Sequence, residues 1–267
     1  MTEELLTRIA DALDRLAPPP LVEADPAQGM HFRWDQRRIL PVRASTPLPL
    51  ERFVGVDHQI AALCQNLSSL AAGAPAHDIL LWGARGTGKS ALVRSVAWHH
   101  ANVPLIETSG DALLSLPALF DRLADVPRPF LVYVDDLAFT GADPGVRMLR
   151  SLLDGGVAER PANVRLAVTS NHRHLVMRDP DVTEASGARH TRDAADDQLA
   201  LADRFGMILG FHVPSQDEYL EMVRRHLDGA PFDPQDALAF ALARGGRSGR
   251  TAWHYRTEFL SRASVPG

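Results

Sequence analysis

A glycine-rich stretch in the first third of the chain has the residue types and spacing of a phosphate-binding loop. Residues 83–90 read Gly-Ala-Arg-Gly-Thr-Gly-Lys-Ser and fit the pattern G-x-x-x-x-G-K-[ST]. Glycines let consecutive backbone N–H groups curl around an anion, because no Cβ atoms stand in the way. We expect the side chain of Lys89 to reach the outer phosphates of a nucleotide and the hydroxyl of Ser90 to bind Mg²⁺.

The residues on either side of this loop support the same interpretation. Residues 79–82 form an apolar run typical of a buried strand, and an amphipathic helix is predicted after the loop. The positive end of that helix dipole would face the bound anion. The residues that we predict to contact the nucleotide here are Gly83, Ala84, Arg85, Gly86, Thr87, Gly88, Lys89, Ser90 and Ala91.

Strand and helix patterns alternate through the middle of the chain. Further apolar runs predict strands at residues 104–107, 130–134, 164–168 and 207–211. Such alternation is typical of an α/β fold, here a three-layer sandwich with a mostly parallel sheet of five strands. Ligands of these sheets bind at the carboxyl ends of the strands. We therefore expect the side chains that follow the strand ends to converge on the loop.

Three polar residues follow two of these strands. Asp135 ends an apolar strand and is the predicted magnesium-side carboxylate, and Asp136 could orient the attacking water as a general base. Asn171 follows the next strand and could hydrogen-bond the terminal phosphate or the water. The alternative is that the two aspartates only cap a strand and that Asn171 only serves a turn.

Three arginines could bring further positive charge to the phosphates. Arg204 could compensate the charge of the transition state if it is supplied to the nucleotide of a neighbouring subunit. Arg247 and Arg250 flank the predicted start of the last helix, and one of them could reach back to the phosphates. Alternatively, Arg204 is a surface arginine paired with an acid, and the other two are merely solvated.

The ends of the chain differ from its middle. Residues 3–16 have the apolar spacing of an amphipathic helix, and the proline-rich stretch up to residue 50 is predicted to be irregular. After Pro214 the pattern is helical throughout, with helix starts predicted at Ser215, Asp233 and Ser248. Residues 178–198 are polar and are predicted to form a loop. The expected organisation is an N-terminal helix and wrapping segment, a nucleotide-binding domain and a small helical lid, at residues 1–50, 51–213 and 214–267.

The order of these motifs resembles that of the AAA+ ATPases. The adenine-side segment would be residues 53–55, Walker A would be residues 83–90, and Walker B would be residues 131–136. Sensor 1 would be Asn171, the arginine finger would be Arg204, and sensor 2 would be residues 247–250. The resemblance implies that Val54 and Gly55 contact adenine, that ATP and Mg²⁺ are bound, and that a homo-oligomer places Arg204 in a neighbour's site.

A narrower resemblance is to one bacterial family of ATP-binding proteins, the domain-of-unknown-function family 815. It is carried by residues 81–90, 152–156, 169–171, 203–206 and 246–250. The resemblance covers about residues 30–260. It implies the fold and the nucleotide, and it implies no cellular role or protein partner.

One departure from the AAA+ pattern bears on activity. These proteins usually have glutamate after the Walker B aspartate, whereas this chain has Asp136, whose carboxylate is one methylene shorter. A displacement of about 1 Å can cost on the order of 100-fold in rate. The sequence therefore predicts an ATPase that remodels a partner, and leaves open a slow or non-hydrolysing ATP-dependent switch. A small-molecule kinase fits less well, because its lid would be inserted between sheet elements.

Composition restricts the other classes of function. The net charge is −5 and the predicted pI is about 6.1, which do not indicate nucleic acid as a partner. Cys64 is the single cysteine, which is typical of a reducing cytosol. The sequence has neither a signal-peptide pattern nor an apolar run of membrane-spanning length. We therefore expect a cytoplasmic protein that does not enter a membrane.

Overall fold

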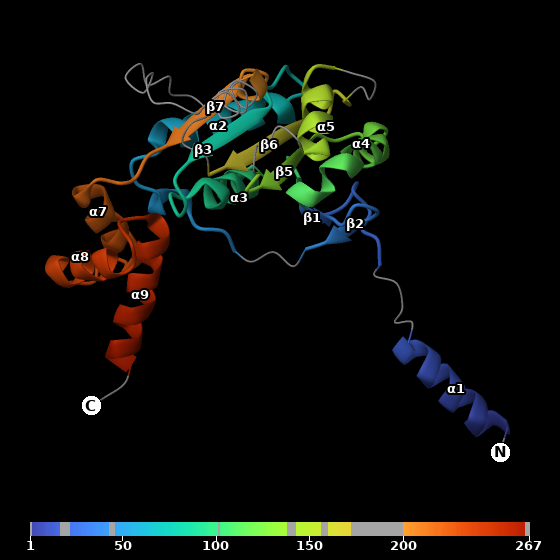
Figure 1. Cartoon of the computed structure of the whole chain (residues 1–267), viewed down its shortest axis with the longest axis horizontal. Coiled ribbons are helices and arrows are strands. Elements are labelled where there is room, and N and C mark those ends of the chain that lie inside the picture. The colour runs from blue at the N-terminus through green and yellow to red at the C-terminus, as the bar shows by residue number, and fades with distance from the viewer. Residues whose placement is uncertain are drawn as a thin grey trace, which may run out of the picture.

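One seven-stranded sheet with helices on both faces forms the body of the protein in the computed structural model (Figure 1). The structure describes residues 2–16, 22–42, 46–100, 102–137, 143–155, 160–171 and 200–264. The strands are β1 (His31–Trp34), β2 (Ile39–Pro41), β3 (Ile79–Gly83), β4 (Leu105–Ser109), β5 (Phe130–Asp135), β6 (Val164–Ser170) and β7 (Met207–Phe211). The α-helices are α1 (Thr2–Leu16), α2 (Asp57–Ala71), α3 (Lys89–His99), α4 (Leu116–Ala124), α5 (Pro144–Leu153), α7 (Gln216–His226), α8 (Pro234–Ala243) and α9 (Gly249–Ser264). Two 3₁₀ helices span Leu50–Arg52 (η1) and Gly110–Ser115 (η2).

The strand order is β2-β1-β4-β5-β6-β3-β7, and every pairing except that of β1 with β2 is parallel. The predicted α/β architecture with a mostly parallel sheet is confirmed. The predicted number of strands is wrong, because β1 and β2 lie in the segment that the sequence predicts to be irregular. They have only four and three residues, too few to show a periodic pattern. Their apolar residues, among them Phe32 and Ile39, are nevertheless buried in the core.

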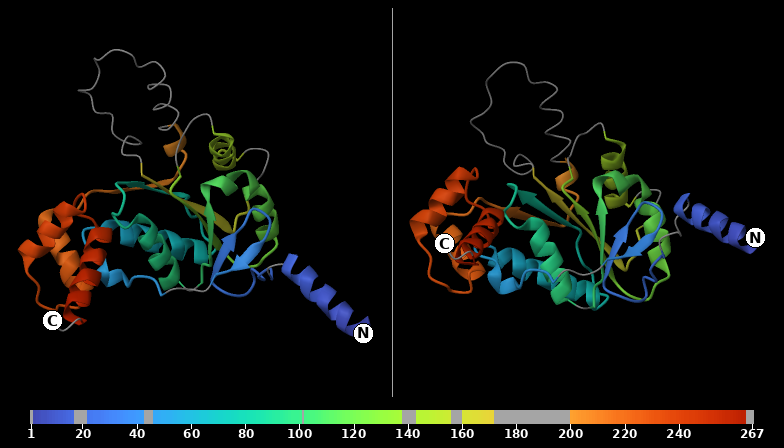
Figure 2. Two further views of the ribbon diagram at one scale, coloured as in Figure 1. Left: turned by 60° about the horizontal axis from the view of Figure 1, so that its bottom comes forward. Right: turned by 90° about the horizontal axis from the view of Figure 1, so that it is seen from below.

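The two faces of the sheet are covered by different helices (Figure 2). Leu80 and Val132 pack with α4, α5 and η2 on one face, and their neighbours Ile79 and Leu131 pack with α2 and α3 on the other. Consecutive side chains of a strand point to opposite faces, so strands buried on both sides read as continuous apolar runs. This explains why the middle strands were predictable from the sequence.

Helices α7, α8 and α9 form a separate layer beside the carboxyl ends of the strands (Figure 1). Tyr219, Val223 and Tyr255 are at the centre of their own apolar cluster. The predicted capping box is present, since the Ser215 side chain accepts from Glu218 N–H and the Glu218 carboxylate accepts from Ser215 N–H. Asp233 caps α8 in a similar way.

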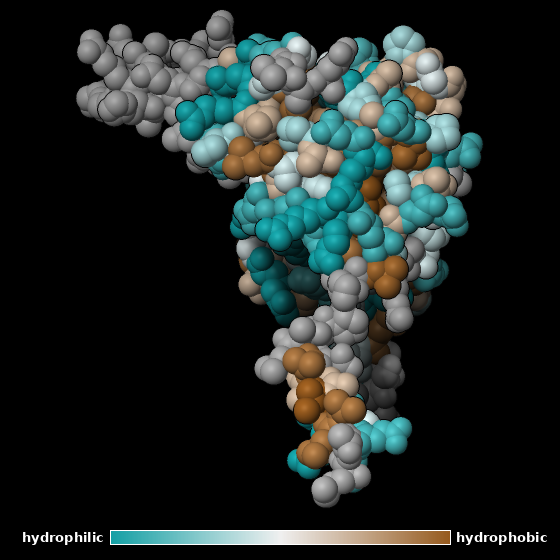
Figure 3. All heavy atoms as spheres, turned by 90° about the vertical axis from the view of Figure 1, so that its right-hand side faces the viewer, coloured by the Kyte–Doolittle hydropathy of each residue, from teal (hydrophilic) through white to brown (hydrophobic). Residues whose placement is uncertain are grey.

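Helix α1 lies away from the rest of the chain (Figure 1), and its apolar side chains form a stripe on its surface (Figure 3). Leu5, Leu6, Ile9 and Leu13 are each more than half exposed. No helix among the described segments is both long and apolar enough to span a membrane. The predicted loop at residues 178–198 lies outside the described residues.

Gly83 provides a test of how tightly the sheet is packed where it enters the phosphate-binding loop. Its φ is +142°, and a Cβ atom there would lie 2.1 Å from the Phe211 carbonyl oxygen of β7. We expect Gly83→Ala to lower the free energy of unfolding by about 2–5 kcal/mol in urea titrations.

Gly73 is the matched control for that substitution. It also has a positive φ, +68°, but a Cβ atom there would meet nothing within 4 Å. Gly73→Ala should cost only the backbone strain, about 1–2 kcal/mol. Equal losses for the two variants would contradict the close approach of β3 and β7.

Candidate functional site

The ends of three neighbouring strands bring the predicted site residues together. Strand β6 lies between β3 and β5, with Trp82 opposite Ser170 and Val134 opposite Val168. The loop after β3, the aspartates at the end of β5 and Asn171 after β6 therefore share one edge of the sheet. Direct contacts join them, since Ser90 Oγ donates to Asp135 Oδ1 at 2.7 Å and Lys89 Nζ donates to Asn171 Oδ1 at 2.9 Å.

Lys89 begins α3 and is almost completely buried, with a relative exposure of 5%. Its ammonium group donates to the carbonyl oxygens of Gly83 and Ala84, both at 2.9 Å, in addition to Asn171. Burial lowers the pKa of Lys89 to about 8, although the charges of Asp136 and Asp135 oppose this shift. The amine is therefore mostly charged at pH 7 and is directed into the concave side of the loop.

Three hydroxyl groups donate to a single oxygen of Asp135. Besides Ser90, Tyr133 Oη donates to Oδ1 at 2.6 Å and Thr169 Oγ1 donates at 2.8 Å. Burial raises the pKa of Asp135, but these hydrogen bonds and the charge of Arg94 outweigh it and hold the pKa below its ordinary value. Asp135 is thus a fixed carboxylate at neutral pH.

A guanidinium group on α3 supports this carboxylate from the opposite side. Arg94 donates to both oxygens of Glu107 on β4 at 2.8–3.1 Å, lies 3.4 Å from Asp135 Oδ2, and stacks over the Tyr133 ring at 5.5 Å. Arg94, Glu107 and Tyr133 were not predicted from the sequence as site residues. No local pattern reveals them, because their meeting depends on the register of β4 with β5 and on the packing of α3.

Asp136 has an uncommon backbone conformation, with φ of +51°. Its N–H donates to Thr169 Oγ1 at 2.9 Å. One carboxylate oxygen accepts from Asn171 Nδ2 and the other lies 3.4 Å from Arg85 Nη2. A continuous series of contacts therefore runs from Lys89 through Asn171 and Asp136 to Arg85.

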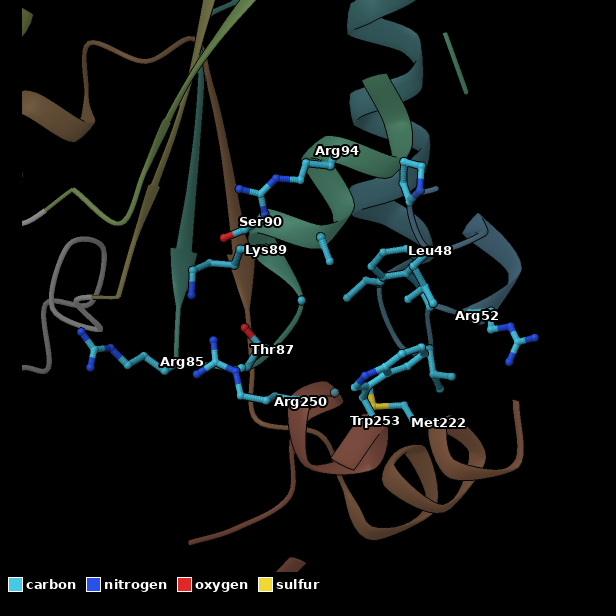
Figure 4. Close-up of a pocket in the computed structure, with 18 of the residues that line it drawn as sticks. Leu48, Arg52, Arg85, Thr87, Lys89, Ser90, Arg94, Met222, Arg250 and Trp253 are labelled. Atoms are coloured by element: carbon cyan, nitrogen blue, oxygen red, sulfur yellow. The ribbon is translucent and has the colours of Figure 1, made fainter. Parts of the chain in front are cut away.

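A cavity of about 960 Å³ extends from these residues toward the lid. Figure 4 shows Thr87, Lys89 and Arg250 at one end and Leu48, Met222 and Trp253 at the other. The predicted residues that line it are Val54, Arg85, Gly86, Thr87, Gly88, Lys89, Ser90, Ala91, Asp135, Asp136, Asn171 and Arg250. Its size and its division into a polar and a less polar end suit a nucleotide.

The remaining predicted residues lie outside the lining of this cavity. The carbonyl oxygens of Gly83 and Ala84 accept from Lys89 Nζ, and Gly55 lies against Glu218 of the lid. Arg204 is paired with Asp154 through Nε at 2.6 Å. Arg247 likewise does not line the cavity, whereas the N–H of Arg250 donates to the Gly86 carbonyl oxygen at 3.2 Å and joins the lid to the loop.

The less polar end of the cavity was predicted from the sequence only at residues 53–55, the adenine-side segment, of which Phe53 and Val54 line it. It is built from the segment before α2 together with α7 and α9. His226 of α7 is buried, its Nδ1 has no hydrogen-bond partner among the described residues, and its ring meets Trp253 edge-on at 5.5 Å. Burial, with the charges of Arg52 and Arg256, lowers the pKa of His226 to about 4. This end is therefore uncharged at His226 and suited to a flat aromatic group such as a base.

The donor set at the polar end suits Mg²⁺ bound together with phosphate. Ser90 and Asp135 present oxygen atoms, the ligands that this ion prefers. Within the described segments, no group of three or more His, Cys, Asp or Glu side chains is placed to hold a metal ion. The ion would therefore take its other ligands from phosphate and water.

Comparisons with known proteins show the family of the chain and proteins that share its fold. A family model described as "Protein of unknown function (DUF815)" matches residues 27–263. The chain is 26% identical over 204 residues to the ATP-dependent zinc metalloprotease FtsH of Cutibacterium acnes (strain SK137), a match that covers 70% of this chain and 27% of FtsH. The chain thus spans about a quarter of that relative.

Two solved structures share the fold at low sequence identity. The Thermotoga maritima RuvB Holliday junction branch migration motor is 18% identical, with a TM-score of 0.52 over 82% of this chain and 67% of that one. The Aeropyrum pernix ORC1 protein in complex with DNA is 17% identical, with a TM-score of 0.55 over 83% of this chain and 63% of that one. The family match, with the Walker-type loop and this fold, shows that the chain belongs to the DUF815 family and is related to the AAA+ P-loop ATPases.

Proposed function

We propose that this protein binds ATP with Mg²⁺ and hydrolyses the bond between the β- and γ-phosphates. The observation that carries the proposal is the series of contacts from Lys89 through Asn171 to Asp136, beside the Ser90–Asp135 pair. It groups a phosphate-binding cation, a polar amide and a second carboxylate beside the one predicted to hold Mg²⁺, which is the set that transfer of a phosphoryl group to water requires. The FtsH relative, whose name describes it as ATP-dependent, supports ATP as the nucleotide.

Each of these side chains has a role in the proposed reaction. The loop N–H groups and Lys89 hold the phosphates, and Asn171 orients the terminal one. Asp136 accepts a hydrogen bond from water and takes its proton while the water oxygen bonds to the γ-phosphorus and the bond to the bridging oxygen breaks, which leaves ADP. Mg²⁺, held through Ser90 and Asp135, would neutralise charge on the phosphates.

We further propose that the site is completed by a second copy of the chain. Arg204 does not line the cavity of its own chain and is instead held by Asp154. The support for a role at a neighbour's nucleotide, where a fixed charge would stabilise the transition state, is the resemblance of its motif to the AAA+ arginine finger, and the pairing with Asp154 would have to be released. Hydrolysis in such an oligomer could then drive the remodelling of a protein partner.

A second candidate is a slow ATP-dependent switch, and a specific observation favours it. Both oxygens of Asp136 already have partners, and its carboxylate is one methylene shorter than the usual glutamate. An Asp136 that does not reach the water would leave ATP bound with little turnover, and the lid would report the nucleotide state.

The shared site predicts that turnover depends on protein concentration. We expect ATP turnover per chain to rise with concentration until the oligomer is complete, and Arg204→Ala to keep turnover low at every concentration while ATP still binds. Steady-state phosphate release and size-exclusion mass, with and without ATP·Mg²⁺, measure this. Arg37→Ala, in the exposed turn between β1 and β2, is the control for loss of one positive charge. Equal rates that do not change with concentration would rule out the shared site.

Substitutions of Asp136 distinguish the two candidates. Asp136→Asn should reduce turnover about 100-fold or more and leave ATP affinity within a few-fold, because asparagine tolerates a positive φ but accepts no proton. Under the ATPase proposal Asp136→Glu also lowers turnover, since glutamate fits this backbone less well. Under the switch alternative it raises turnover. Asp121→Asn, on the exposed face of α4, is the matched control.

The pKa of Lys89 predicts a pH dependence of ATP binding. Lys89 is the only lysine of the chain, and the protonated amine is the form that binds phosphate. Because its pKa is lowered to about 8 in the free protein and bound phosphate raises it, affinity should fall by up to about tenfold per pH unit above pH 8. Titration calorimetry between pH 7.5 and 9.5, in two buffers of different ionisation enthalpy, should show proton uptake at the high end. Adenosine, which has no phosphate, should show neither effect, and an ATP affinity that is constant over this range would contradict the assignment.

A further inference from the structure

Arg85, the third residue of the phosphate-binding loop, is the one side chain of the contact series whose role the proposed reaction leaves unassigned. It lines the cavity and points away from the loop backbone, to one side of Lys89 (Figure 4). Its guanidinium lies 3.4 Å from Asp136, and the two side chains have relative exposures of 75% and 53%. An ion pair this exposed is worth at most about 1 kcal/mol, so a better anion would displace it readily.

The position of Arg85 relates it to the outermost phosphate. Its partner Asp136 contacts Asn171, and Asn171 contacts the Lys89 ammonium group. Lys89 reaches the outer phosphates in a loop of this type, so Asp136 and Arg85 lie beyond the inner phosphates. Arg85 is also close enough to Lys89 for its charge to act on that amine, as Arg250 is.

A nucleoside triphosphate would change the balance among these charges. In the structure Lys89 is held by neutral oxygen atoms and Arg85 by a single exposed carboxylate. The terminal phosphate carries more negative charge than a carboxylate and presents three oxygen atoms. A guanidinium group binds such an anion with two parallel hydrogen bonds, which lysine cannot do. Transfer of Arg85 from Asp136 to that phosphate would also free one oxygen of Asp136.

We propose that Arg85 is a γ-phosphate contact supplied by the same chain, which leaves Asp136 when a triphosphate binds and so gives Asp136 a free oxygen for the attacking water. The inference rests on the proposed binding of ATP and deepens it. Arg85 distinguishes ATP from ADP within one subunit, whereas Arg204 acts on a neighbour's site. ADP, which lacks the γ-phosphate, leaves Arg85 paired with Asp136.

The test compares affinities for the two nucleotide states. Dissociation constants of AMPPNP·Mg²⁺, which is not hydrolysed, and of ADP·Mg²⁺ are measured by titration calorimetry for the wild type, Arg85→Ala, Arg85→Lys and the control Arg37→Ala. Arg85→Ala should weaken AMPPNP about tenfold or more and ADP less than threefold, with Arg85→Lys intermediate. Asp136→Ala should strengthen AMPPNP relative to ADP, because it releases Arg85.

Two results would overturn the proposal. Equal weakening of both nucleotides by Arg85→Ala would mean that the residue only maintains the loop, and stronger AMPPNP binding would mean that it only neutralises Asp136. These affinity measurements need no turnover, so they test the role of Arg85 even if the wild type binds ATP without hydrolysing it. A wild type that binds ATP without hydrolysing it would count against the ATPase proposal and not against the role of Arg85.

Mixing experiments separate a same-chain arginine from a neighbour's arginine. Lys89→Ala chains, which cannot hold phosphate, are mixed with Arg85→Ala or with Arg204→Ala chains. The Arg204→Ala mixture should regain turnover, because a Lys89→Ala chain can supply its Arg204 to a neighbour with an intact loop. The Arg85→Ala mixture should show no more turnover than its Arg85→Ala chains show alone, since no chain in it has both Lys89 and Arg85. Recovery in the Arg85→Ala mixture would overturn the same-chain assignment.

Discussion

The buried ammonium group of Lys89 is the constraint on which the arrangement of this site depends. A charge with 5% exposure is costly unless it is fully hydrogen-bonded, and here its three acceptors come from the end of β3 and from the residue after β6. The lysine therefore joins the start of α3, the loop and the neighbouring strand. The acceptors are neutral, so an entering phosphate would offer the amine a stronger partner than any that it now has.

The less polar half of the cavity is built in a different way, by contacts between the lid and the segment before α2. The guanidinium of Arg225 donates to the carbonyl oxygens of Glu51 and Phe53, both at 2.7 Å, and Arg52 donates to the Arg225 carbonyl oxygen at 2.5 Å. The Arg250 N–H holds the other side of the lid on Gly86. The cavity is therefore lined both by the phosphate-binding loop and by lid helices α7 and α9, so a ligand that fills it would contact both.

The sequence predicted the polar half of the site better than the less polar half, for a physical reason. The loop, Asp135, Asp136 and Asn171 all follow strands buried on both faces, and parallel strands bring their carboxyl ends to one edge whatever the details of packing. Leu48, Met222 and Trp253 come from three segments whose meeting depends on how the lid docks, which no local pattern encodes. Tyr133 and Glu107 were missed for a related reason, since each looks like an ordinary strand residue until the sheet register is known.

The backbone of Asp136 gives the departure from glutamate a structural meaning. A φ of +51° is tolerated much better by aspartate and asparagine than by residues with longer side chains, and the N–H of Asp136 is tied to Thr169, whose hydroxyl in turn donates to Asp135. The two aspartates are thus positioned by one threonine, and the turn between them sets the direction of the second carboxylate. A longer side chain would extend the reach of that carboxylate and strain the turn. The shorter acid and the left-handed turn therefore suit each other, and the presence of aspartate is not by itself a sign of a degraded site.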